Sequence, residues 1–232
     1  MHATLNRFDP GVEARLDAML AGSPGLAVFD ADHTLYCEDA GEAFYRELFG
    51  DARFAEYRAL EARNSFAAYA KIATDMAGME EVHLQERASA FFREHFAPRV
   101  YPAMRRLIDR LGEAGWRVHV VTASPRWIIQ AGAPLFGLAA EQVIGVDVAL
   151  EAGRLTDRLA YALPYGPGKV HAIERFLGAR PRFAAGDSAA DRFMLETATH
   201  GALALAYDDY PAQQPLLDRA RERGWMIQRC SK

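Results

Sequence analysis

Short apolar runs alternate with longer amphipathic segments along most of the chain. Residues 26–29 are apolar and lie between a Gly-Ser-Pro-Gly stop and two carboxylates, a pattern typical of a buried parallel strand. Further strands are expected at about residues 116–122, 143–150, 183–185 and 202–206. Helices are expected at about residues 12–20, 103–114 and 212–223, and after Pro125, Gly168 and Ser188. This alternation predicts an α/β fold with a doubly wound parallel sheet.

The stretch from about residue 40 to residue 97 interrupts the alternation. It predicts helices and no strand, with helices at about residues 41–48, 52–62, 66–76 and 81–96. An insertion after the first strand lies over the crevice at the carboxyl ends of the strands. We therefore expect a Rossmann-like core of residues 1–36 and 98–232 and a helical cap of residues 37–97 that serves as a lid.

Composition and charge exclude several classes of partner. The 232 residues carry a net charge of -4, so the sequence predicts no basic surface for binding nucleic acid or an anionic membrane. Acids interrupt the N-terminal stretch, so no signal peptide is expected, and no window is apolar enough to span a bilayer. Cys37 and Cys230 fit free thiols in a reducing compartment. We expect a cytoplasmic protein with a small-molecule partner; its oligomeric state is left open.

Two carboxylates, Asp30 and Asp32, follow the first strand. Side chains alternate along an extended chain, so both leave the backbone on the same side. Two ionised carboxylates this close repel each other, and they persist together if a metal neutralises them or if one keeps a proton. A Mg²⁺ ion with a carboxylate nucleophile and a neighbouring acid satisfies both conditions. The alternative interpretation is a capped loop after a strand.

Other predicted strand and helix ends supply groups that suit an anion. Thr122 ends the second strand and is followed by small residues and a helix N-terminus, which together favour an anion. Ser124 is interpreted as the N-cap of that helix, with Pro125 as its first residue. Lys169 opens a later helix, where the dipole disfavours a cation unless a negative group lies nearby. It is therefore either a functional residue or a solvated surface lysine.

The strand at residues 183–185 ends in a further acidic motif. Gly186 allows close approach, Asp187 follows it, and Asp191 comes four residues later at the start of the next helix. Asp187 alone fits a helix N-cap. Together with Asp30 and Asp32 it supplies the third source of oxygen ligands that a Mg²⁺ site requires.

These segments together resemble the haloacid dehalogenase superfamily of phosphatases. The resemblance rests on Asp-x-Asp-x-Thr at residues 30–34, Thr122, Lys169 and Gly-Asp-Ser-x-x-Asp at residues 186–191, and it extends from about residue 26 to residue 227. The helical insertion, the segment 146–155 and the tail 216–227 resemble the branch that contains phosphoserine phosphatase, with its helical C1-type cap.

The resemblance implies a Mg²⁺-dependent phosphomonoester hydrolase. Asp30 would attack phosphorus and become an aspartyl-phosphate, while Asp32 would protonate the leaving oxygen and then accept a proton from the hydrolytic water. Thr122 and Lys169 would hold the phosphoryl oxygens. Phosphoryl transfer depends on such positioning and charge neutralisation, and the second carboxylate favours phosphate-ester over carbon–halogen chemistry.

The resemblance also implies a metal site. Asp187, the carboxylate of Asp30 and the backbone carbonyl of Asp32 would bind Mg²⁺. Asp191 would orient Lys169 or a metal-bound water.

Several positions depart from the phosphoserine phosphatase pattern. His33 stands where the family usually has a small residue, and residues 122–124 differ from Ser-Gly-Gly. Glu38 and Asp39 fall near the place where those enzymes use an acid to meet the substrate ammonium, so they and Ser124 are candidate substrate-binding residues. Candidates for binding a substrate carboxylate are Arg58, Arg63 and Lys71. Phosphoserine is thus one possible substrate among several.

Aromatic residues are frequent in the predicted cap: Phe44, Tyr45, Phe54, Tyr57, Phe66, Tyr69, Phe91, Phe92 and Phe96. At helical spacing such residues usually form the core of the cap itself. A sharper hypothesis is that one or two of them, with Glu38 or Asp39, form a pocket for an amine such as a choline or ethanolamine head group.

Two other functions remain open on the sequence. A phosphotransferase or mutase would use the same site with another hydroxyl in place of water. A non-catalytic phosphate-binding regulatory module could share the fold, because a fold does not fix a function.

Overall fold

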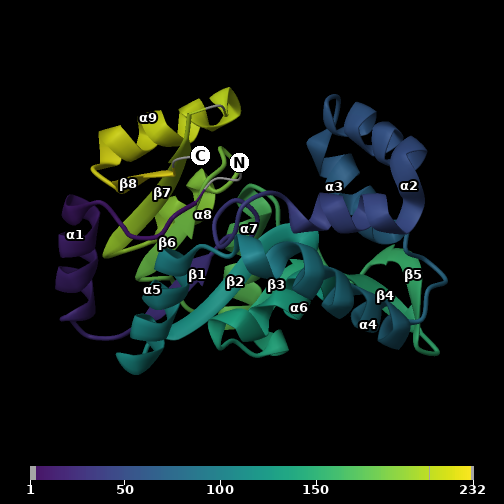
Figure 1. The fold of residues 1–232 in the computed structure, drawn as a ribbon, viewed down its shortest axis with the longest axis horizontal. Helices are drawn as coiled ribbons and strands as arrows, with labels where there is room; N and C mark the ends of the chain where they lie inside the picture. Colours follow the sequence, from purple (N-terminus) through teal and green to yellow (C-terminus); the bar gives the residue numbers. More distant parts are fainter. Residues whose placement is uncertain (1–3, 209, 231–232) are drawn as a thin grey trace.

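A six-stranded sheet forms the centre of the computed structural model, which describes residues 4–208 and 210–230. Its strands pair in parallel in the order β3-β2-β1-β6-β7-β8 (Figure 1). Their bounds are β1 Leu26–Phe29, β2 Arg117–Pro125, β3 Val143–Val146, β6 Phe183–Gly186, β7 Gly201–Tyr207 and β8 Met226–Cys230. The order reverses on either side of β1, so the crevice of the sheet lies at the carboxyl end of this strand.

Helices cover both faces of the sheet, which confirms the doubly wound α/β fold. Alternation along β1 sends Ala27 and Phe29 into one apolar cluster and Leu26 and Val28 into the other. The helices of the first cluster are α1 Pro10–Leu20, α5 Pro102–Glu113 and α6 Arg126–Gly132. The helices of the second are α7 Pro167–Leu177, α8 Arg192–Thr197 and α9 Gln214–Arg223. Both faces are buried, which explains the unbroken apolar run of this strand.

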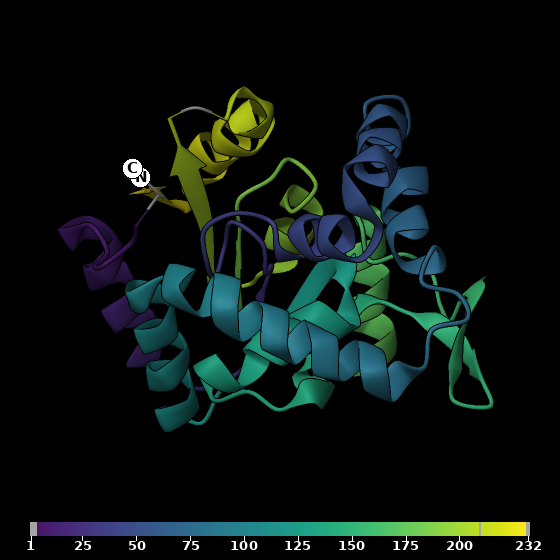
Figure 2. The same ribbon diagram turned by 45° about the vertical axis from the view of Figure 1, so that its right-hand side comes forward.

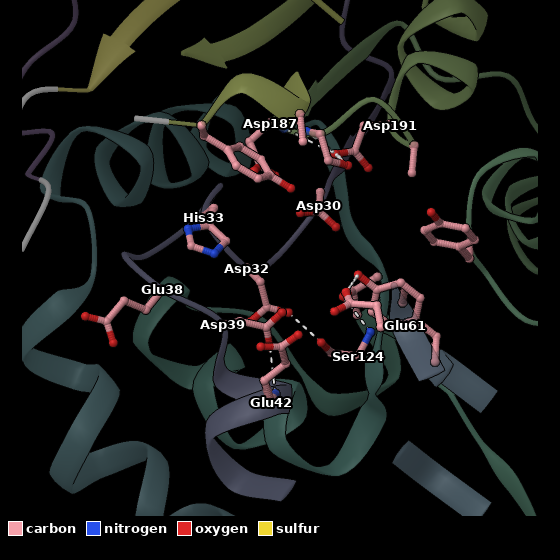
Figure 3. Close-up of a pocket in the computed structure, with 18 of the residues that line it drawn as sticks. Asp30, Asp32, His33, Glu38, Asp39, Glu42, Glu61, Ser124, Asp187 and Asp191 are labelled. Atoms are coloured by element: carbon pink, nitrogen blue, oxygen red, sulfur yellow. Dashed lines mark hydrogen bonds between the residues drawn. The ribbon is translucent and has the colours of Figure 1, made fainter. Parts of the chain in front are cut away.

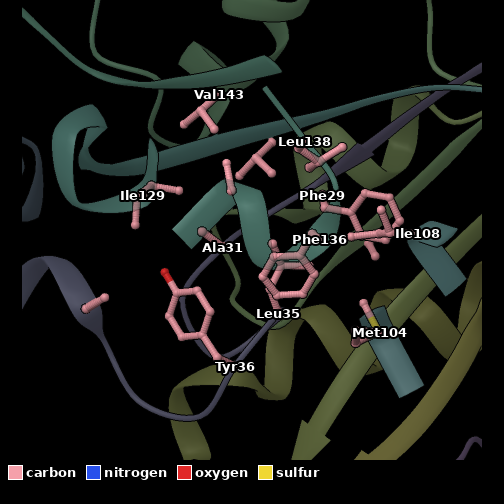
Figure 4. Packing of buried hydrophobic residues seen from close by; sticks show 14 of the residues in the cluster. Phe29, Ala31, Leu35, Tyr36, Met104, Ile108, Ile129, Phe136, Leu138 and Val143 are labelled. Carbon is pink, nitrogen blue, oxygen red and sulfur yellow. The ribbon is translucent and has the colours of Figure 1, made fainter. Parts of the chain in front are cut away.

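The loop after β1 is anchored in the first cluster. Figure 4 shows Ala31, Leu35 and Tyr36 among side chains from α5 and from the segment that follows α6. All three are less than 3% exposed. Apolar residues therefore alternate with the two carboxylates in this motif and fix the loop against the sheet.

Helices occupy the stretch between β1 and β2, as expected. They are α2 Ala40–Glu61, α3 Ser65–Thr74 and α4 Glu81–Phe91, followed by a π-helical turn Phe92–Phe96 and a 3-10 turn Ala97–Arg99. The two helices expected at residues 41–48 and 52–62 join in α2, which is broken at Gly50 with φ of 80°. Figure 2 shows α2 and α3 rising from the core, whereas α4 lies along it and packs against α6. The division into core and cap domains stays a prediction.

The prediction of a single strand at residues 143–150 is wrong. The chain forms β3 and then a separate hairpin of β4 Val148–Glu151 and β5 Arg154–Leu159. The break falls at Asp147, whose carboxylate accepts a hydrogen bond from Val148 N at 2.9 Å and pairs with Arg126 at 2.8 Å. Ala152 and Gly153 both have positive φ, which suits a two-residue hairpin turn. The strands β5 and β8 were not predicted.

The hairpin is bonded to the loop between α3 and α4. Gly78 N donates to Leu155 O at 2.8 Å, and Leu155 N donates to Met79 O at 2.9 Å. In the described part of the chain, no helix combines the length and the apolar character needed to cross a membrane.

Candidate active site

A cavity of about 660 Å³ lies at the carboxyl ends of β1, β2 and β6, with α2 and α3 on its opposite side. It brings together nine candidate site residues: Asp30, Asp32, Glu38, Asp39, Thr122, Ser124, Lys169, Asp187 and Asp191. Figure 3 shows Asp187, Asp191 and Asp30 at one end and Asp39, Glu42 and Glu61 toward the other. We call Asp30, Lys169, Asp187 and Asp191 the floor of the cavity, and Asp39, Glu42, Arg58, Glu61 and Tyr69 its helical side. The roles of these residues stay predictions.

Lys169 lies between two carboxylates of the floor. Its Nζ donates to Asp30 Oδ1 at 2.5 Å and to Asp191 Oδ1 at 2.6 Å, and the residue is 2% exposed. The preceding Gly168 is required for this placement, because a Cβ there would lie 2.0 Å from Leu163 O. A cation at a helix start is therefore compensated by two buried negative charges.

Burial and neighbouring charges shift the pKa values of these groups. Burial alone would lower the pKa of Lys169, but the charges of Asp191 and Asp30 raise it above its usual value. Burial and the charge of Asp191 raise the pKa of Asp30 to about 7, although Lys169 opposes this shift. Burial, followed by the charges of Asp30 and Asp191, raises the pKa of Asp187 well above its usual value. The floor therefore has more negative charge than one lysine can neutralise.

A divalent cation fits this excess charge. Carboxylate oxygens of Asp30, Asp187 and Asp191 lie within 4.8 Å of one another, and an all-oxygen donor set suits Mg²⁺. Asp191 is, however, already engaged through both oxygens. Oδ1 accepts from Lys169, and Oδ2 accepts from Asp187 N at 3.2 Å, from Ser188 N at 3.0 Å and from Ser188 Oγ at 2.8 Å. The free coordination capacity thus lies with Asp30 and Asp187, and Asp191 is placed to orient Lys169.

Gly186 makes room for Asp191. A Cβ at this position would lie 2.6 Å from the Cβ and 2.7 Å from the Cγ of Asp191. The close approach expected from the sequence is therefore confirmed, and the group that approaches is the side chain of Asp191.

Asp32 is held in one orientation by three donors. Tyr36 OH donates to its Oδ1 at 3.0 Å, Ala40 N donates to the same oxygen at 2.7 Å, and Ser124 Oγ donates to Oδ2 at 2.5 Å. Because Ala40 is the first residue of α2, the carboxylate also lies at the positive end of a helix dipole. The start of the inserted helices is thus bonded directly to the motif after β1.

The interpretation of Ser124 as a helix N-cap is wrong. Strand β2 continues to Pro125, α6 begins at Arg126, and no side chain caps it. The hydroxyl of Ser124 is instead committed to Asp32, and its N–H donates to Thr122 Oγ1 at 3.1 Å. The extended segment keeps both hydroxyl residues in the cavity wall.

Besides Glu42, Glu61 and Tyr165 of the cavity wall, the sequence analysis missed three side chains that contact the acidic residues of the site. Thr34 Oγ1 lies 3.3 Å from Asp30 Oδ2 and 3.4 Å from Asp187 Oδ1, Tyr36 bonds Asp32, and Ser188 bonds Asp191. The signal for Thr34 and Ser188 was their position inside the two acidic motifs. Tyr36 had no such signal, because a tyrosine after an apolar residue indicates only the core.

On the helical side, Arg58 is paired with two carboxylates. Its Nη1 lies 2.7 Å from Glu42 Oε1 and 2.7 Å from Glu61 Oε2. Asp39 is the N-cap of α2, with Oδ1 accepting from Glu42 N at 2.7 Å. Burial, followed by the charges of Asp32 and Glu42, raises the pKa of Asp39 well above its usual value.

The other candidates for substrate contact are paired with groups of the protein. Arg63 bonds a backbone carbonyl of α2, and Lys71 pairs with Asp75 at 2.7 Å; neither is among the described residues that line the cavity. Glu38 pairs with Arg99 at 2.5 Å and points away from the other carboxylates in Figure 3. Of the three basic candidates, Arg58 alone reaches the cavity.

Most of the aromatic residues between β1 and β2 are core residues. Phe44, Tyr45, Tyr57, Phe92 and Phe96 are all less than 2% exposed. Phe66 is 55% exposed. Tyr69 lines the cavity and packs on Tyr165, with ring centroids 4.9 Å apart.

A family model described as haloacid dehalogenase-like hydrolase matches residues 27–196 of the chain. The chain belongs to this family. The match begins in β1 and ends in α8, so it contains every residue of the floor. No curated protein sequence matches the chain.

Solved structures share the fold of this haloacid dehalogenase-like hydrolase. A protein of unknown function from Bordetella pertussis Tohama I is 23% identical, with a TM-score of 0.74, and the alignment covers 89% of this chain and 98% of that one. A phosphoserine phosphohydrolase-like protein from Francisella tularensis is 15% identical, with a TM-score of 0.60 and coverage of 89% and 94%. A substrate-bound phosphoserine phosphatase complex is 16% identical, with a TM-score of 0.57 and coverage of 79% and 87%.

Proposed function

We propose that this haloacid dehalogenase-like hydrolase is a Mg²⁺-dependent phosphomonoesterase that acts on a small phosphorylated metabolite through an aspartyl-phosphate. The observation that carries the proposal is the floor, where a buried lysine lies between Asp30 and Asp191 and Asp187 adds uncompensated negative charge. This is the arrangement that phosphoryl transfer requires, with a nucleophile, a fixed cation and a metal-binding pair of carboxylates together. Family membership and the phosphatases among the structural neighbours support it.

In the proposed reaction, a carboxylate oxygen of Asp30 attacks phosphorus and the phosphorus–oxygen ester bond breaks. The leaving oxygen takes a proton from Asp32, whose orientation is fixed by Tyr36, Ala40 and Ser124. Water then attacks phosphorus, gives its proton to Asp32 and regenerates the carboxylate of Asp30.

Further groups at the floor and beside it neutralise the charge of the phosphoryl group and fix the direction of the lysine side chain. Lys169 and the hydroxyl of Thr122 would hold phosphoryl oxygens, while Asp191 keeps the ammonium directed at Asp30. Mg²⁺, held by Asp30 and Asp187, would supply the positive charge that balances the transferred group. Binding of the ion would also keep Asp30 ionised despite its raised pKa.

The first test is phosphate release from p-nitrophenyl phosphate and a panel of small phosphomonoesters, with Mg²⁺ or with EDTA. Turnover that needs Mg²⁺ and is lost in Asp30→Asn supports the proposal. The matched control is Asp109→Asn, which changes an exposed carboxylate of α5 and should keep full activity. Release that survives EDTA or the Asp30 substitution would disprove the mechanism.

The same assay separates the remaining alternatives. A phosphotransferase would transfer the group to an added alcohol faster than to water. A regulatory module would bind phosphate without releasing it from any ester.

A further inference from the structure

The charge in the cavity is strongly unbalanced. Among its described lining residues are eight carboxylates, one lysine and one arginine. Lys169 neutralises one of the negative charges of the floor, and a Mg²⁺ ion bound by Asp30 and Asp187 would neutralise two more. Of the other carboxylates, Asp32 is held by three donors and Glu38 pairs with Arg99. The excess left to a substrate therefore lies on the helical side, about where the part of a substrate beyond its phosphate would lie.

The charge of the one arginine on the helical side is outweighed by two carboxylates. Arg58 is already held by Glu42 and Glu61, each at 2.7 Å. Glu42 also accepts from Tyr57 OH at 3.2 Å, and Glu61 lies 3.4 Å from Tyr69 OH. Both contacts are made through Nη1, so a substrate carboxylate that approached the other N–H groups of Arg58 would meet two carboxylates at close range. The cluster therefore opposes an anionic group.

Asp39 lacks a cationic partner among the described residues. Its Oδ1 caps α2, and no hydrogen bond to its Oδ2 is found in the described part of the chain. The side chain lines the cavity near Asp32 and Glu42 (Figure 3). An ammonium group placed against Oδ2 would relieve the repulsion among these three carboxylates.

An aromatic wall lies beside these charges. Tyr69 from α3 and Tyr165 from the loop before α7 pack at 4.9 Å and line the same cavity, so the wall joins the inserted helices to the core. Tyrosine rings attract organic cations, particularly those whose alkyl groups also contact the ring faces. The ring faces of the wall and the carboxylates, one of which (Glu61) contacts Tyr69 OH, favour the same kind of ligand.

We propose that the helical side selects phosphomonoesters whose leaving group carries an ammonium group and no carboxylate, with Asp39 and the Tyr69–Tyr165 wall holding the cation. This substrate class rests on the phosphomonoesterase proposed above. The class excludes the phosphate esters of zwitterionic amino acids, because Arg58, which could have bound a substrate carboxylate, is neutralised within the protein.

The test compares kcat/KM for phosphocholine, phosphoethanolamine, phosphoserine and glycerol 3-phosphate at one pH and one Mg²⁺ concentration. Phosphocholine and phosphoethanolamine should exceed the other two by at least about tenfold, a difference that one charge pair in a partly buried site can supply. Equal values for glycerol 3-phosphate, or a preference for phosphoserine, would overturn the proposal and leave the phosphomonoesterase function intact.

Variants then connect the preference to its residues. Asp39→Asn removes the charge but keeps a residue that caps helices well, and it should lower the ratio of phosphocholine to glycerol 3-phosphate turnover about tenfold. Tyr69→Leu should lower the phosphocholine value more than the phosphoethanolamine value. Asp51→Asn is the matched control, since its side chain lies on α2 but is 80% exposed. A ratio that stays constant in Asp39→Asn would contradict the assignment.

Binding separates this proposal from the catalytic one. Calorimetry on Asp30→Asn with Mg²⁺ measures the affinity of each ester without turnover. Tighter binding of phosphocholine than of glycerol 3-phosphate by this variant, together with no phosphate release by the unsubstituted protein, would support the specificity and disprove the hydrolase. Equal binding of the two esters would overturn the specificity whatever the outcome of the activity assay.

Discussion

The floor of the cavity and its helical side use charge in opposite ways. In the floor, Lys169 is enclosed by Asp30 and Asp191, and both oxygens of Asp191 are engaged. On the helical side, Arg58 is neutralised by α2 itself, and Asp39 faces the cavity without a cation among the described residues. A floor whose lysine is fixed between two carboxylates suits a fixed reaction, whereas a carboxylate left unpaired among the described residues of the helical side suits a cation that the substrate brings with it.

The largest effect is expected from removing the lysine of the floor. Lys169→Met should lower kcat by about 10³-fold, because a preorganised cation that stabilises the transferred group is lost. It also leaves two carboxylates facing each other, so the pKa of Asp30 should rise further. Steady-state kinetics on a variant shown to be folded by circular dichroism checks this prediction. Activity within about tenfold of the parent would mean that the floor is structural.

Gly186→Ala should disturb the floor without removing any functional group. The added Cβ would lie 2.6 Å from the Cβ of Asp191, so the carboxylate that orients Lys169 must shift. A displacement of this kind costs about 10²-fold in kcat and about 1–3 kcal/mol in the free energy of unfolding. The control is Gly112→Ala on α5, where nothing lies within 4 Å of an added Cβ. Equal behaviour of the two variants would contradict the packing described for Asp191.

A smaller effect is expected on the helical side. Glu61→Gln removes one of the two negative charges that hold Arg58, so the guanidinium becomes partly available to a substrate carboxylate. The ratio of phosphoserine to phosphocholine turnover should then rise by about three- to tenfold. Glu222→Gln, which changes an exposed partner of Arg219 on α9, serves as the control. An unchanged ratio would show that the pairing of Arg58 does not govern selectivity.

The smallest effect is a pH-dependent change in stability. The pKa of Asp30 is raised from 3.8 to about 7 in the folded protein without metal, so the folded state binds more protons than the unfolded state between these values. Its contribution to the free energy of unfolding is therefore full below about pH 4 and is lost as the pH rises through about 7.

Thermal melts in EDTA between pH 5 and pH 8 measure this loss. Mg²⁺ should restore stability, and the shift in Tm that it produces should grow as the pH rises, because the ion competes with protons for Asp30. In Asp30→Asn the pH dependence should flatten. A Mg²⁺ shift that does not change with pH would contradict the raised pKa of this carboxyl.

The floor could be predicted from the sequence because its residues lie at the ends of regular elements. Asp30, Asp187 and Lys169 each follow a recognisable strand or begin a helix, and parallel strands necessarily bring their carboxyl ends to one edge. Ser124 shows where such local reasoning fails. A Ser-Pro pair is a good helix start in isolation, but the bond to Asp32 and the pairing with β3 keep the chain extended there.

What the sequence by itself determined was the α/β order, the position of the inserted helices and the carboxylates and lysine of the floor, since these follow from local periodicity and the geometry of parallel strands. What the tertiary structure alone decided was the β4–β5 hairpin, the neutralisation of Arg58 and the wall formed by Tyr69 and Tyr165. Each of these depends on which faces of separate elements meet. That is set by packing across the whole chain, and no local pattern of residues encodes it.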